Sequence, residues 1–188
     1  MGVKFASLAI AIFGLAGTAG AQAAPAPAQP PVAIPNPHYV SIVQEIEINR
    51  PAAAVWARVG KYCGISEWFG MTCALVSGQD GDLGAVRVLN GSIIEMLVAK
   101  TDLSYTYAQP VRVGVPYNAY HGTMEAKPVS ATSSKMVYSL FFDNSMLPDD
   151  AAREQDIARR KARFAQALQN MKILAEGGTL PASAPAAR

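Results

Sequence analysis

The feature that most restricts the fold of this chain is a long amphipathic segment near its C-terminus. Pro148–Asp150 is typical of a helix start, because a carboxylate there can cap free backbone amides at the positive end of the helix dipole. Neither Gly nor Pro follows until Gly177–Gly178, where the helix is expected to stop. One face carries Ile157, Phe164, Leu168, Met171 and Ala175. With a rise of about 1.5 Å per residue the helix is about 40 Å long, so it must pack along a partner of similar length.

The segments before this helix predict that partner to be an antiparallel sheet. Alternating apolar residues, or short apolar runs between turn residues, are typical of strands. Asn90-Gly91 between two such runs indicates a tight hairpin. The predicted strands are Tyr39–Asn49, Cys73–Val76, Ala85–Leu89, Ile93–Ala99, Ser104–Ala108, Asn118–Lys127 and Lys135–Asp143. Two short helices, Ala52–Val59 and one near Ile65–Trp68, are expected between the first two strands. A curved sheet wrapped on one helix either packs large side chains inside or leaves a cavity.

The N-terminus has the three parts of a secretory signal peptide. Lys4 precedes an apolar run from Phe5 to Leu15, and Ala-x-Ala sequences end at Ala21 and Ala23. A membrane anchor is the alternative, but a span needs about 20 apolar residues and Gly14 and Gly17 interrupt this run. We therefore expect a periplasmic or secreted protein without stable membrane insertion after cleavage.

The remaining chain divides by composition. We predict a signal peptide over residues 1–23, a linker rich in Pro and Ala over 24–37, one domain over 38–176 and a disordered tail over 177–188. The domain contains two cysteines, Cys63 and Cys73. In an oxidising compartment they favour a structural disulfide. Two buried thiols or a reactive pair are the other interpretations.

The charge pattern does not favour nucleic acid as a partner. The formal net charge of +2 falls to +1 once Lys4 is removed, and phosphate binding needs clustered cations. Arg153, Arg159, Arg160, Lys161 and Arg163 do lie close in sequence, but acidic residues lie among them, so we interpret them as the solvated face of the helix. The sequence has no Ser-His-Asp order, no Gly-rich phosphate loop and no metal-ligand spacing. No cofactor or metal is expected.

Several short motifs, in this order, resemble the SRPBCC or START-like helix-grip superfamily, which includes lipid-transfer domains, polyketide cyclases and dehydratases, pollen allergens and abscisic-acid receptors. The resemblance covers about residues 40 to 175. The motifs are Ala52-Ala53-Ala54-Val55-Trp56, Ile65-Ser66-Glu67-Trp68-Phe69, Gly84-Ala85-Val86-Arg87, Ile94-Glu95-Met96-Leu97, Asp102 with Tyr105-Thr106-Tyr107, and Asn118-Ala119-Tyr120-His121-Gly122-Thr123. The resemblance implies an α+β helix-grip fold, in which a curved antiparallel sheet of about seven strands surrounds a long C-terminal helix and a ligand cavity.

Glu95 is the most prominent candidate site residue. It shares a strand face with Ile93, Leu97 and Ala99, and the glutamate at this position of the superfamily motif points into the cavity. Apolar surroundings would raise the pKa of such a carboxyl and suit it to acid or base chemistry. The alternative is a charge at the surface or rim, paired with Arg87.

The other candidates are residues expected to line the same cavity. Alternation places Tyr120 inside and His121 outside. The predicted ligand-binding set is Trp68, Met71, Glu95, Tyr105, Tyr107, Tyr120, Tyr138, Phe164 and Leu168. Met71 stands where abscisic-acid receptors have a lysine for the ligand's carboxylate, so an acidic ligand held in that manner is not expected.

Three functions follow from these observations. The first is binding or carriage of a small hydrophobic ligand, such as a lipid, an aromatic or a polyketide-like molecule, in the cell envelope. The second is a cyclase, dehydratase or lyase in which Glu95 is the acid or base and Tyr120 polarises an oxygen. The third, an interaction protein that uses the long helix, has weaker support from that helix's mixed charges.

Overall fold

A computed structural model describes residue 2 and residues 36–111 and 114–181 of the chain. The predicted signal peptide, nearly all of the predicted linker and the end of the predicted tail lie outside these residues. None of the described helices is both long and apolar enough to cross a lipid bilayer.

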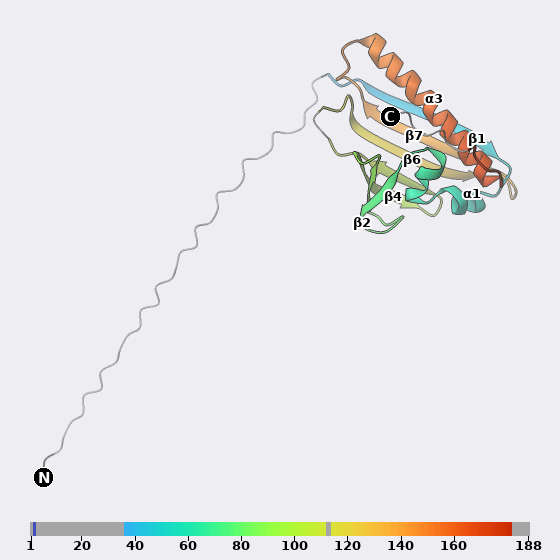
Figure 1. The fold of residues 1–188 in the computed structure, drawn as a ribbon, viewed down its shortest axis with the longest axis horizontal. Helices are drawn as coiled ribbons and strands as arrows, with labels where there is room; N and C mark the ends of the chain where they lie inside the picture. Colours follow the sequence, from blue (N-terminus) through green and yellow to red (C-terminus); the bar gives the residue numbers. More distant parts are fainter. Residues whose placement is uncertain (1, 3–35, 112–113, 182–188) are drawn as a thin grey trace. The chain divides into compact units, whose positions relative to one another are not determined.

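A seven-stranded antiparallel sheet forms the main layer of the domain (Figure 1). The strands lie in the order β1-β7-β6-β5-β4-β3-β2, so the first strand pairs with the last. Their bounds are β1 Tyr39–Ile48, β2 Cys73–Ser77, β3 Val86–Leu89, β4 Ile93–Thr101, β5 Ser104–Ala108, β6 Asn118–Pro128 and β7 Ser134–Asp143. Every predicted strand is confirmed, with ends that differ by at most two residues.

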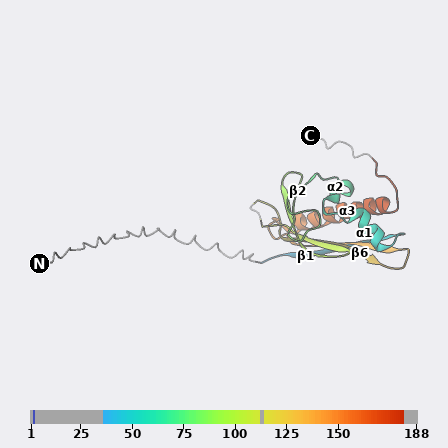
Figure 2. The same ribbon diagram turned by 90° about the horizontal axis from the view of Figure 1, so that it is seen from below.

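The helices all lie on one face of this sheet (Figure 2). Two short helices, α1 (Ala52–Val59) and α2 (Ile65–Trp68), were expected, and a 3-10 turn over Tyr62–Gly64 between them was not. The long helix α3 spans Asp150–Ala175. Its start is capped as expected, because the Asp149 side chain accepts a hydrogen bond from the Ala152 amide at 2.8 Å. The predicted α+β helix-grip architecture is therefore confirmed.

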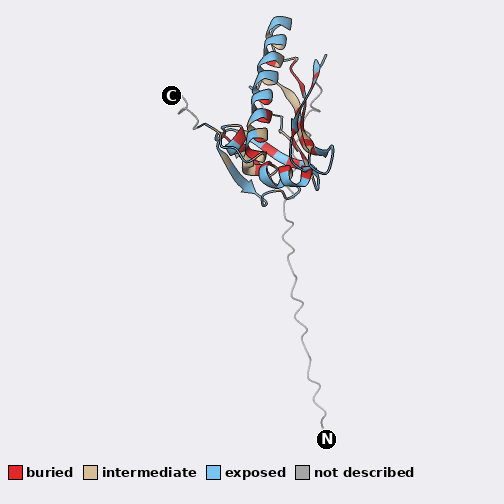
Figure 3. Ribbon diagram, turned by 90° about the vertical axis from the view of Figure 1, so that its right-hand side faces the viewer, coloured by how far each residue is buried: buried red, intermediate tan, exposed pale blue. Residues whose placement is uncertain are grey.

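The core lies between the sheet and the helices. Along β1, Val40, Ile42 and Ile48 are buried and the even-numbered residues between them are half-buried, while the odd-numbered residues are exposed, as the two-residue period predicted. On α3 the buried side chains include Phe164, Leu168 and Met171, and the outward side of the helix is exposed (Figure 3). The predicted apolar stripe of α3 is thus the surface that faces the sheet.

One irregularity changes which residues of β4 face inward. The pairing with β5 shifts between Leu97 and Ala99, so Val98 is an extra residue in the ladder. Leu97 is buried and Ala99 is exposed. The expectation that Ala99 shares the inner face with Glu95 was wrong, because a β-bulge interrupts the alternation of side chains along a strand.

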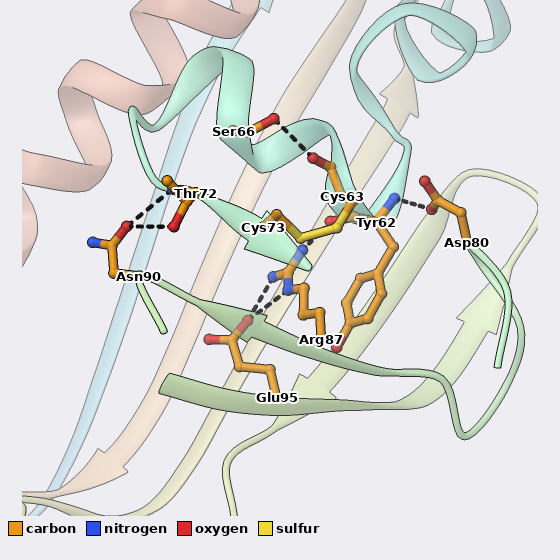
Figure 4. Close-up of a disulfide and its surroundings, with 9 residues drawn as sticks. All are labelled: Tyr62, Cys63, Ser66, Thr72, Cys73, Asp80, Arg87, Asn90 and Glu95. Carbon is orange, nitrogen blue, oxygen red and sulfur yellow. Dashed lines mark hydrogen bonds and ion pairs between the residues drawn. A yellow bond between two sulfur atoms is a disulfide. The ribbon is translucent and has the colours of Figure 1, made fainter. Parts of the chain in front are cut away.

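A disulfide joins Cys63 in the 3-10 turn to Cys73 at the start of β2, with 5.7 Å between their Cα atoms. The predicted structural bridge is confirmed. It ties the segment that contains α2 to the edge of the sheet and holds the backbone of Tyr62 beside β3 (Figure 4).

Candidate functional site

A cavity of about 230 Å³ lies between the inner face of the sheet, α2 and α3. Its apolar lining is Ile65, Phe69, Met71, Leu89, Ile93 and Phe164. Its uncharged polar and acidic lining is Tyr107, Tyr117, Tyr120, Tyr138, Gln109 and Glu95. Three arginines of α3, Arg159, Arg160 and Arg163, complete the wall. A cavity lined by apolar and aromatic side chains, with a few converging polar groups, is typical of a small-molecule site.

Six of the nine predicted ligand-binding residues line this cavity: Met71, Glu95, Tyr107, Tyr120, Tyr138 and Phe164. Trp68, Tyr105 and Leu168 do not line it and are buried in the core, each at most 3% exposed. The Trp68 ring packs against the rings of Phe69 and Tyr138, with centroids 5.7 and 6.3 Å apart. Tyr105 instead borders a separate, more open depression between α1 and the β4–β5 hairpin. The periodicity of a strand or helix predicts which side chains face the interior. It does not predict which of these side chains border the cavity.

The Glu95 carboxylate forms a buried ion pair with Arg87. Leu89 pairs with Ile93, so the β3–β4 loop has three residues and Arg87 lies opposite Glu95. Arg87 is fully buried and Glu95 is 3% exposed. Nε and Nη2 of Arg87 donate to Glu95 Oε2 at 2.8 and 2.6 Å. Both sequence interpretations of Glu95 therefore hold in part, because the carboxylate is paired with Arg87 and yet lines the cavity.

Arg87 is held on its other sides by backbone and aromatic rings. Its Nη1 donates to the Tyr62 carbonyl, next to the disulfide (Figure 4). The guanidinium carbon lies 4.0 Å from the Tyr62 ring centroid and 5.1 Å from that of Tyr107. Burial opposes the charge of Arg87, but the neighbouring Tyr105 and Glu95 outweigh it, and the pKa of the guanidinium is raised. Arg87 is therefore a permanent buried cation.

The second oxygen of Glu95 connects to a chain of polar groups along the cavity wall. Gln109 donates from Nε2 to Glu95 Oε1 at 2.9 Å, and the Tyr117 hydroxyl donates to Gln109 Oε1 at 2.7 Å. Burial raises the pKa of the Glu95 carboxyl, and the charge of Arg87 only partly offsets this effect. Oε1 makes one hydrogen bond among the described residues, so it retains capacity to accept another from a ligand.

Three tyrosines place hydroxyl groups around the interior. The hydroxyls of Tyr107 and Tyr138 are 3.0 Å apart, and burial raises the pKa of both phenols well above the ordinary value. Burial also raises the pKa of Tyr120. These phenols stay protonated at physiological pH, so they act as neutral hydrogen-bonding groups. Tyr120 faces inward at 5% exposure, and His121 is exposed as expected, with its Nδ1 2.8 Å from the Ala119 carbonyl oxygen.

The arginines of α3 were interpreted as a solvated helix face, and Arg159 and Arg163 are indeed exposed, whereas Arg160 is only partly so. That interpretation did not include their position at the cavity. Arg159, Arg160 and Arg163 line the cavity. The Arg160 guanidinium packs 4.5 Å from the Phe142 ring centroid, and that of Arg163 lies 4.5 Å over Phe69. Long cationic side chains can cover aromatic surface while their heads stay in water. Charge pattern alone does not reveal this arrangement.

Gln109 and Tyr117 were also missed as site residues. Both belong to the segment between β5 and β6, which the sequence indicated only as a proline-containing loop. Side chains of such loops have no period that assigns them a direction. The one available signal was that this loop connects two strands whose inward tyrosines were already candidates.

Comparison with known proteins agrees with this architecture. A family model described as polyketide cyclase / dehydrase and lipid transport matches residues 39–176. A solved protein from Thermobifida fusca is similar at 22% identity and a TM-score of 0.62, over 75% of this chain and 97% of that chain. The Zhui aromatase/cyclase from Streptomyces sp. R1128 is similar at 16% identity and a TM-score of 0.56, over 76% and 100%.

Truncated norcoclaurine synthase from Thalictrum flavum has a TM-score of 0.56 at 12% identity, over 79% of this chain and all of that one. At such identities the structural neighbours show a shared fold. No curated protein sequence matches this chain.

Proposed function

Because this chain belongs to the family of polyketide cyclases, dehydrases and lipid-transport proteins, we propose that it binds and carries a small ring-bearing hydrophobic molecule in the cavity beneath α3. The observation that carries the proposal is the aromatic cavity with Glu95 and Gln109 in its wall. A flat apolar body would pack against Phe69 and Phe164, since ring contacts contribute most of the energy in such sites. A hydroxyl or similar donor on the ligand would donate a second hydrogen bond to Glu95 Oε1, beside the one from Gln109.

The size of the cavity restricts the ligand class. At about 230 Å³ it is smaller than the roughly 300–1,000 Å³ of typical ligand pockets. A compact molecule of one or two rings suits this volume better than a long acyl chain. Polyketide-like molecules of several fused rings would require the walls to move.

The place of action that we propose is the cell envelope. The Cys63–Cys73 disulfide supports this, because such bonds persist in oxidising compartments. The predicted signal peptide lies outside the described residues, and its cleavage remains part of the proposal. A free small molecule is then the expected partner.

The binding proposal is tested with the neutral fluorescent probe N-phenyl-1-naphthylamine. Ile93 lines the cavity and Ile94, the next residue of β4, is 37% exposed on the outer face. Ile93→Trp should fill the cavity and weaken probe binding about tenfold or more, while the matched control Ile94→Trp should bind as the wild type does. Native mass spectrometry of the purified protein should also detect one retained small molecule. No probe binding and no retained molecule, or equal effects of the two variants, would reject the proposal.

A lyase or cyclase activity is the second candidate, because the raised pKa of Glu95 in a cavity suits a general acid or base. Carriage is favoured, because two nitrogens of Arg87 already donate to Glu95 Oε2. Only Oε1, which accepts one hydrogen bond from Gln109, is then left to interact with a substrate. Extracting the retained material separates the two functions. A mixture of substrate and product that becomes substrate alone in Glu95→Gln or Tyr120→Phe supports catalysis, and one unchanged molecule in all variants supports carriage.

A further inference from the structure

We propose that the ligand is a ring-bearing carboxylic acid, whose ring lies in the cavity and whose carboxylate binds Arg163 and Arg159 on α3. This inference rests on the proposed binding function and specifies the ligand class of the same site. It comes from the distribution of charge around the cavity.

The cationic side chains of the wall outnumber the acids that neutralise them. Arg159, Arg160 and Arg163 line the cavity, and the carboxylate of α3 that pairs with two of them is the buried Asp156. Asp156 accepts from Arg159 Nη2 at 2.5 Å through one oxygen and from Arg160 Nε at 2.8 Å through the other. One carboxylate thus serves two guanidinium groups, and the three arginines retain a net positive charge.

Arg163 is the cation with free hydrogen-bonding groups. Within the part of the chain that the structure describes it has no hydrogen bond or ion pair, and its guanidinium is only stacked over Phe69. Arg159 has one bond to Asp156 and a side chain that is 69% exposed. The two residues are four apart on α3, so they lie on the same face one turn apart. A planar carboxylate matches the fork of donors that a guanidinium presents.

Arg160 does not compete for this role. Its side chain is 15% exposed, bonded to Asp156 and packed against the rings of Tyr117, Tyr120 and Phe142. It forms part of the wall, while Arg163 and Arg159 lie where an anion can reach them from solvent.

The interior charge sets the orientation of such a ligand. Glu95 is the acid that lines the cavity, and its charge is already matched by the buried Arg87. A second carboxylate placed beside Glu95 would be repelled and desolvated. The acid group therefore stays at the α3 arginines and the ring enters the cavity. Met71 supplies no charge, as the sequence indicated, and the cations come from α3 instead.

The test uses bound N-phenyl-1-naphthylamine as a neutral reporter and two competitors of nearly equal shape, 2-naphthoate and 2-naphthamide, at neutral pH. We expect the acid to displace the reporter at about tenfold lower concentration than the amide. Added salt should reduce this preference, because an exposed ionic contact is screened. In Arg163→Gln the preference should fall several-fold, and in the double variant Arg159→Gln, Arg163→Gln it should disappear, because acid binding weakens more than amide binding does.

Lys161→Gln is the matched control, because it removes one exposed positive charge from the same turns of α3 without touching the cavity lining. It should leave the acid-to-amide preference as in the wild type. Equal competition by acid and amide in the wild type, or the same loss in Lys161→Gln, would overturn the inference while reporter binding still supports the carrier function. If the reporter itself does not bind and no molecule is retained, the carrier function fails first.

Discussion

Arg87 and Glu95 lie directly opposite each other on β3 and β4, and two nitrogens of the arginine donate to the same oxygen of the glutamate. This leaves Glu95 Oε1 to Gln109 and to the cavity. The pair therefore belongs both to the core, through Arg87, and to the candidate site, through Glu95. Its two halves differ in one respect, since a carboxylate can take up a proton and a guanidinium cannot release one.

We expect substitution of Glu95 to lower the free energy of unfolding more than substitution of Arg87 does. Glu95→Leu leaves a permanent buried cation and should lower the free energy of unfolding by about 3–5 kcal/mol. Arg87→Leu should cost less, because Glu95 can become neutral. The double variant should be more stable than Glu95→Leu. Urea unfolding of the three variants at neutral pH measures these differences, and simple addition of the two single effects would contradict the coupling.

The pH dependence of stability should report the raised pKa of Glu95. The folded protein holds this proton more tightly than the unfolded chain, in which the pKa is about 4.3. The resulting stabilisation is fully present below that pH and is lost as the pH rises through the folded-state pKa. The stability of the wild type relative to Glu95→Gln should therefore decrease as the pH rises from about 4.3. NMR titration of the Glu95 carboxyl carbon checks the cause, and an ordinary or lowered pKa would refute it.

The absence of a side chain at Gly122 leaves the space that the Tyr107 ring occupies in the cavity wall. The two residues pair across β5 and β6, and a Cβ added to Gly122 would lie 2.3 Å from the Tyr107 hydroxyl. Gly122→Ala should therefore displace Tyr107, weaken its contact with Tyr138 and lower the free energy of unfolding by about 1–3 kcal/mol. Probe affinity should fall as well.

The matched control for Gly122→Ala is Gly64→Ala. A Cβ at Gly64 would meet only ordinary contacts, of which the shortest is 3.4 Å to Lys61 Cβ. This variant should keep both stability and probe affinity. If Gly122→Ala binds the naphthylamine probe as the wild type does, Tyr107 does not shape the ligand site.

The Cys63–Cys73 bridge should contribute to stability chiefly by restricting the unfolded chain. For so short a loop we expect the double variant Cys63→Ser, Cys73→Ser to lower the free energy of unfolding by about 2–3 kcal/mol. Urea unfolding of the wild type with and without a thiol reductant should show the same loss, and the double variant should not respond to the reductant. An effect of the reductant on that variant would assign the loss to something other than the bridge.

Local patterns determined much of this protein before its tertiary structure was considered. The capped, Gly- and Pro-free segment before Gly177 required a long helix, and period-two alternation placed Val40, Ile42 and Tyr120 on inner faces. Hydrophobic periodicity and turn residues depend on residues that are close in sequence. The helices and strands can therefore be predicted from the sequence alone. The spacing of Cys63 and Cys73 indicated their bridge for the same reason.

Only the tertiary structure decided which of these side chains meet. It placed Tyr105 and Trp68 in the core beside the cavity, and it brought Gln109 from a loop to Glu95. It also showed that Arg163, an exposed charge as expected, borders the cavity as well. A helix face can be predicted from its period, but whether an exposed cation on that face also borders a cavity depends on where distant strands and loops end. That contact is set by packing between segments far apart in the chain.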